Sequence, residues 1–76
     1  MYLLDSMIDM GLKPRQKWPT AAHRAVAINL AIGNPMIRTR NALTEIVQKV
    51  RRIPVSKIKT VKVAELPKFG IHLFAA

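Results

Sequence analysis

The stretch NPMIRTRNALTEIVQKVRRI, residues 34–53, has the clearest periodicity in the chain. Asn34 can cap a helix, Pro35 suits its first position and Pro54 would stop it. Glu45 and Lys49 have the i,i+4 spacing of a helical ion pair. The apolar side chains gather on one helical face: Met36, Leu43, Ile46, Val47, Val50 and Ile53. We therefore predict a single amphipathic helix that ends near residue 53.

The residues before this stretch predict a second helix, over 21–32. Thr20 is a good N-cap, and Gly33-Asn34-Pro35 would end the helix. Its polar residues His23, Arg24 and Asn29 point in widely separated directions, so the helix is apolar on nearly all sides. A chain this short cannot surround such a helix, and we expect a partner protein to cover one side. We expect His23 to be a surface or hydrogen-bonded residue and not a metal ligand.

The N-terminal residues 2–10 predict a short amphipathic helix that Gly11 closes. Its polar side holds Asp5, Ser6 and Asp9. Its apolar side holds Leu3, Leu4, Met7, Ile8 and Met10. We prefer docking on the rest of the chain to a membrane anchor, because the polar side lacks Lys and Arg.

The C-terminal residues predict a β-hairpin. Residues 55–63 are β-branched and basic, residues 71–74 form a second β-like run, and residues 64–70 contain turn residues. A helical alternative would place Val55, Ile58 and Val61 on one face. The fold class that we expect is mainly α with a small C-terminal β-hairpin, an α+β protein whose incomplete core is completed by partners.

These elements form one expected domain, 1–76. It consists of an amphipathic helix (1–11), an extended basic arm (12–19), a helical pair (20–53) and a basic β-like tail (54–76).

Charge is the strongest indication of function. The 76 residues include 13 Lys and Arg against 4 Asp and Glu, a net charge of +9, and no Cys. Residues 1–10 hold two acids and no base, so all thirteen bases lie in residues 11–76. Such a field attracts polyanions, nucleic acid first and anionic lipid second. The alternative is a surface that is positive only for solubility.

The arm between Pro14 and Pro19 combines cations with Trp18, the only Trp. An extended arm of this kind suits a groove or a strand of RNA, on which Trp18 could stack. We favour a second interpretation, in which Trp18 caps the core.

Bases also flank the predicted helix, Arg40 with Arg51 on one side and Arg38 with Lys49 on the other. Each pair would span roughly 16 Å. Long bases that shield the edge of a core would give the same pattern. The residues expected to bind nucleic acid are Lys13, Arg15, Lys17, Trp18, Arg38, Arg40, Lys49, Arg51, Arg52, Lys57, Lys59 and Lys62.

Other classes of function find little support in the sequence. We expect no enzyme, cofactor, metal site or small-molecule substrate, because there is no phosphate loop, ligand cluster or nucleophile beside a base. A helix-turn-helix around residues 33–35 is less favoured, since the first helix lacks a polar outer face. No apolar run approaches the roughly 20 residues of a membrane span, and the acidic start is unlike a signal or transit peptide. We expect an intracellular protein, in the cytoplasm or an organelle interior, or a virion component.

The segment 44–50 followed by Val55-Ser56-Lys57 resembles part of the Alba family of small basic nucleic-acid-binding proteins. It covers less than a quarter of the chain. The order of elements differs from that family, so no residue role is carried over. In composition the chain is similar to ribosomal proteins.

Together these features predict a non-enzymatic structural subunit of a large assembly that binds nucleic acid through its phosphates, most simply a ribosomal-type protein on rRNA beside other protein subunits. A repeated virion protein packed against its genome and an accessory subunit of a membrane complex are the alternatives.

Overall fold

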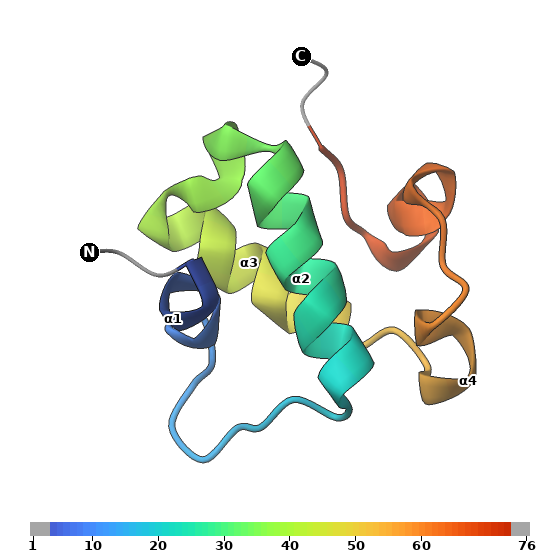
Figure 1. Cartoon of the computed structure of the whole chain (residues 1–76), viewed down its shortest axis with the longest axis horizontal. Helices are drawn as coiled ribbons and strands as arrows, with labels where there is room; N and C mark the ends of the chain where they lie inside the picture. Colours follow the sequence, from blue (N-terminus) through green and yellow to red (C-terminus); the bar gives the residue numbers. More distant parts are fainter. Residues whose placement is uncertain (1–3, 74–76) are drawn as a thin grey trace.

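The computed structural model describes residues 4–73, which form short helices joined by tight connections (Figure 1). The helices in chain order are α1 (Leu4–Asp9), α2 (Ala21–Gly33), η1 (Pro35–Arg38), α3 (Arg40–Arg51), α4 (Val55–Ile58) and η2 (Val63–Phe69), where η denotes a 3₁₀ helix. α1, α2 and α3 pack against one another, and α4 packs on α2. The C-terminal segment lies on the side of α2 away from α1.

One apolar core unites these helices. Its buried members are Ile8, Ala27, Leu30, Ala31, Ile37, Leu43, Ile46, Val47, Val50, Ile53, Ile58, Leu66 and Ile71. α1 places Ile8 fully inside, which confirms that this segment docks on the rest of the chain. Leu3 lies outside the described residues, and Met10 is 70% exposed, so its predicted place on the buried side is wrong.

The predicted limits of α2 are confirmed. The Thr20 side chain accepts a hydrogen bond from the backbone N–H of His23 at 3.3 Å, as an N-cap does. α2 buries one side and exposes another on which Ala21, Ala25 and Asn29 lie with Ile32. Because two of these four residues are alanines, this side of α2 offers little apolar surface to a partner. Completion of the core by another protein stays a prediction.

The single helix predicted over residues 34–53 is wrong at its start. Thr39 has an extended backbone, with φ −74° and ψ 152°, and it separates η1 from α3. Asn34 does not cap the next helix, since its amide donates to the Leu30 carbonyl at the end of α2, at 2.9 Å. The break turns Ile37 into the core and leaves Met36 71% exposed. The remaining apolar positions of the stripe, from Leu43 to Ile53, are buried as predicted.

The predicted C-terminal hairpin is also wrong, because residues 4–73 contain no β-strand. Successive turns close their own backbone hydrogen bonds, for example from Ile58 N to Pro54 O and from Ile71 N to Leu66 O. Each turn inserts one side chain, Ile58, Leu66 or Ile71, into the core. A strand packed on this core would bury every second residue, but Val63 is 69% exposed. Phe74 lies outside the described residues.

Candidate nucleic-acid interface

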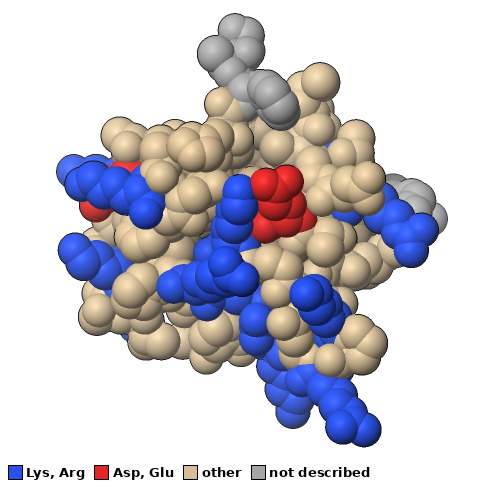
Figure 2. Space-filling view, turned by 180° about the vertical axis from the view of Figure 1, so that it is seen from behind, with Lys and Arg blue, Asp and Glu red and all other residues tan. Residues whose placement is uncertain are grey.

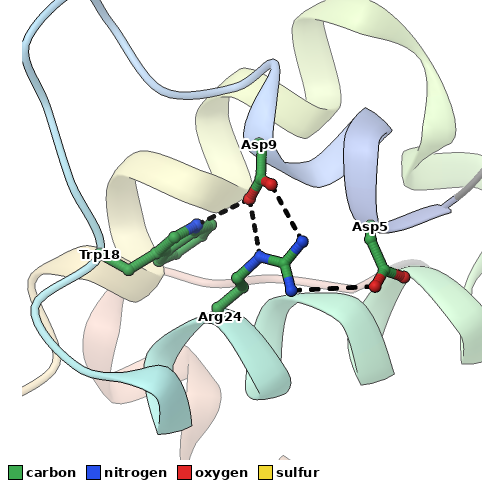
Figure 3. A network of polar contacts seen from close by, with 4 residues as sticks. All are labelled: Asp5, Asp9, Trp18 and Arg24. Atoms are coloured by element: carbon green, nitrogen blue, oxygen red, sulfur yellow. Dashed lines mark hydrogen bonds and ion pairs between the residues drawn. The ribbon is translucent and has the colours of Figure 1, made fainter.

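The acidic side chains neutralise few of the cations. Arg24 forms ion pairs with both N-terminal acids (Figure 3). It binds the Asp9 carboxylate through two nitrogens, and it lies 3.8 Å from the Asp5 carboxylate. Lys49 pairs with Glu45 at 2.7 Å, which confirms the predicted helical pair. Among residues 4–73, which include all thirteen Lys and Arg, only Arg24 and Lys49 form a salt bridge. The net positive charge is therefore left on the other bases.

These ion pairs lower the pKa values of the acids that form them. Hydrogen bonds from Arg24 above all, with a further one from Trp18, hold the pKa of Asp9 below its ordinary value against the opposing effect of partial burial. The ammonium of Lys49 likewise lowers the pKa of Glu45.

The loop 12–19 is fastened along α3. The Gln48 amide donates to the Gly11 carbonyl at 3.1 Å and to Gln16 Oε1 at 2.7 Å. Further along, Arg51 Nε donates to the Lys17 carbonyl at 3.1 Å. The loop is not the extended arm that was predicted, because it turns at Arg15, where φ is +68°, and Gln16 N bonds back to Lys13 O. This turn brings the loop cations beside the C-terminal half of α3.

The opposite side of α3 meets the end of η2. A side chain at Gly70 would lie 3.8 Å from Lys49 Cδ and Cε, so the Lys49 stem crosses this glycine. The loop and the C-terminal half of α3 together present what we call the basic surface: Lys13, Arg15, Lys17, Lys49, Arg51 and Arg52. Figure 2 views the molecule from behind, the side on which α3 lies, and shows Lys and Arg side chains gathered near the centre of that face and along its lower part.

Trp18 lies at the edge of the core, as the favoured interpretation held. It is half-buried, packs against the core cluster and donates from Nε1 to Asp9 Oδ1 at 2.9 Å (Figure 3). Its indole therefore joins α1 to the loop.

Two predicted arginines lie away from the basic surface. Arg38 donates from Nε to the Ala31 carbonyl at 2.9 Å and from Nη2 to the Ile32 carbonyl at 3.2 Å. It thus supplies a positive charge to the C-terminal end of α2, which is the negative end of the helix dipole. Arg40 begins α3, and because Arg38 precedes the break, the predicted flank of Arg38 and Lys49 on one helix does not exist.

Lys57, Lys59 and Lys62 occupy another edge of the molecule. They lie on and just after α4, which packs on α2, and all three are exposed. Because this segment is not a strand, the three lysines do not lie along one. They are nevertheless as exposed as Lys13, Lys17 and Arg52 of the basic surface.

His23 is buried and hydrogen-bonded at both ring nitrogens. Nδ1 lies 2.7 Å from Thr20 Oγ1, and Nε2 lies 2.7 Å from the Ile53 carbonyl oxygen. A carbonyl only accepts, so Nε2 carries the proton in this bond. Within residues 4–73 no three His, Asp or Glu side chains are grouped so that they could hold a metal ion.

None of the comparisons with known proteins yields a match: no family model, curated protein or solved structure is similar to this chain. Among the described residues, no helix combines the length and apolar character needed to cross a membrane.

Proposed function

We propose that this chain is a non-enzymatic nucleic-acid-binding protein that contacts phosphates through the basic surface, with RNA of a ribonucleoprotein particle as its target. The observation that carries the proposal is the meeting of cations from two separate segments. The loop 12–19 is hydrogen-bonded along the C-terminal half of α3, so its cations lie beside those of α3. Charges gathered in this way match the repeated charges of a phosphate backbone.

The contacts that hold the surface together support the same proposal. Gln48 and Arg51 bind the loop through its carbonyls, so the loop is held in place before any ligand arrives. Less ordering entropy is then lost on binding than for a free basic tail. Phosphate contacts carry no sequence information, so we expect binding with little preference among sequences.

The test is the affinity of the full chain for a single-stranded RNA and for an RNA duplex, measured by fluorescence anisotropy over a salt series. The proposal predicts that log affinity falls linearly with log salt, with a slope of about −0.7 per phosphate contacted on a single strand. A flat dependence would contradict it. So would stronger association with anionic phospholipid vesicles than with either RNA at the same salt.

A further inference from the structure

An open pocket of about 500 Å³ lies at the N-terminal end of α3. Its apolar wall is made by Met7, Met10 and Leu43, and its polar side by Arg38, Arg40 and Thr44. The volume falls within the range of about 300–1,000 Å³ that small-ligand sites occupy. An apolar wall beside two arginines suits a ligand with a flat or apolar body and a negative charge.

The pocket opens onto the same ridge of α3 that leads to the basic surface. Arg40, Thr44, Gln48 and Arg52 follow one another at i,i+4 spacing and so share one side of the helix. Gly11 borders the pocket, and its carbonyl accepts the hydrogen bond from Gln48. From Thr44 to Arg52 the ridge rises about 12 Å, the length of three to four stacked nucleotides at about 3.4 Å each.

One of the two arginines at the pocket, Arg38, is held in place without a ligand. The Arg38 guanidinium is held by the carbonyls of Ala31 and Ile32. The Thr44 hydroxyl donates to the Arg40 carbonyl at 3.0 Å, which uses its hydrogen within α3. Met10, by contrast, lines the pocket and is 70% exposed, so its side chain is not needed to fill the core.

We infer that this pocket receives one unpaired base of a bound RNA strand, whose backbone continues along the α3 ridge to the basic surface. The inference rests on the proposed function and adds to it a preference for single-stranded over duplex RNA. An unstacked base offers a flat face to Met10 and to the Arg40 guanidinium, and a paired base does not. Its own phosphate would lie toward Arg40 and Arg38.

The experiment compares wild type, Met10→Ala and the matched control Met36→Ala, in which an equally exposed methionine outside the pocket is changed. The probes are a single-stranded RNA of about ten nucleotides and the same strand in a duplex. We expect Met10→Ala to weaken single-strand binding about fivefold or more and to leave duplex binding unchanged. Met36→Ala should alter neither. In NMR spectra, the Met10 methyl resonance should shift with the single strand, and that of Met36 should not.

Two results would overturn the inference and leave the proposed function standing. One is equal affinity for both RNA forms with no effect of Met10→Ala. The other is a Met10 methyl shift caused by decanoate but not by the single strand, which would make the pocket a site for anionic amphiphiles. If neither RNA form binds in a salt-dependent manner, the proposed function fails and the inference fails with it.

Discussion

The Asp9 carboxylate of α1 and the Arg24 guanidinium of α2 form a two-pronged ion pair, with Nε–Oδ1 and Nη2–Oδ2 distances both 2.9 Å (Figure 3). Trp18 donates to the same carboxylate, so one side chain joins α1, the loop 12–19 and α2. Within the pair, the positive charge of Arg24 offsets the negative charge of Asp9, and the other bases keep the net positive charge.

We predict that Asp9→Asn lowers the free energy of unfolding by about 1 kcal/mol, a value reduced for the 43% exposure of the side chain. The matched control is Asp5→Asn, which removes a charge from the same helix but only a 3.8 Å contact of a 60% exposed group. It should have little effect. Urea unfolding followed by Trp18 fluorescence measures both, and equal losses in the two variants would contradict the special role of Asp9.

The same pair predicts how stability depends on pH. Because the pKa of folded Asp9 lies below its ordinary value, its contribution is complete above the unfolded pKa of about 3.9 and is lost as the pH falls through the folded pKa. Wild-type stability should therefore decline below about pH 4. The stability of Asp9→Asn should decline less steeply over this pH range. The decline that remains comes from Glu45, whose pKa is also lowered. Parallel curves for the two proteins would show that Asp9 is not involved.

Gly11 is required where the chain leaves α1 and passes α3. A Cβ at this position would lie 2.6 Å from Val47 Cγ2 and 3.1 Å from the Leu43 carbonyl oxygen, both in the interior. We expect Gly11→Ala to cost about 1–3 kcal/mol, as overpacking of a core does. Gly33→Ala is the control, because a Cβ there meets nothing within 4 Å. Thermal unfolding should show a loss for Gly11→Ala alone, and a loss of the same size at both positions would contradict the close approach.

His23 connects the start of α2 to the end of α3 through the Ile53 carbonyl. Replacing it by Ala leaves that buried oxygen without its donor and opens a cavity, at a cost of about 2–4 kcal/mol. Thr20→Ala, which removes only the cap and the Nδ1 partner, should cost about 1 kcal/mol. Denaturant unfolding would contradict this ranking if Thr20→Ala were the more damaging change.

Local sequence signals predicted the parts of the fold that local forces decide. Thr20 and Gly33 mark the ends of α2, and the stripe from Leu43 to Ile53 marks the buried face of α3, since caps and helical periodicity are properties of neighbouring residues. The break at Thr39 was missed because Asn34 bonds backward to α2 and not forward to α3. That choice depends on where α2 ends in space.

Sequence patterns could not predict the C-terminal segment or the arrangement of the candidate site. Ile58, Leu66 and Ile71 are too widely spaced for one helix or strand period, and only the packing of separate turns brings them into one core. The sequence alone did not predict which of the cations the fold brings together. Gln48, which fastens the loop to α3, is an ordinary polar position in the sequence, and nothing near it marks its partners Gly11 and Gln16.

The central claim is that the basic surface, and not positive charge in general, binds RNA. It is tested by two variants that each remove three exposed positive charges: Lys13→Gln/Lys17→Gln/Arg52→Gln on the basic surface, and Lys57→Gln/Lys59→Gln/Lys62→Gln in the segment from α4 to the start of η2. The measurement is the slope of log affinity for a single-stranded RNA against log salt. We predict that the slope becomes shallower by about 2 in the first variant and stays at the wild-type value in the second. An equal change in both variants, or a larger one in the second, would contradict it.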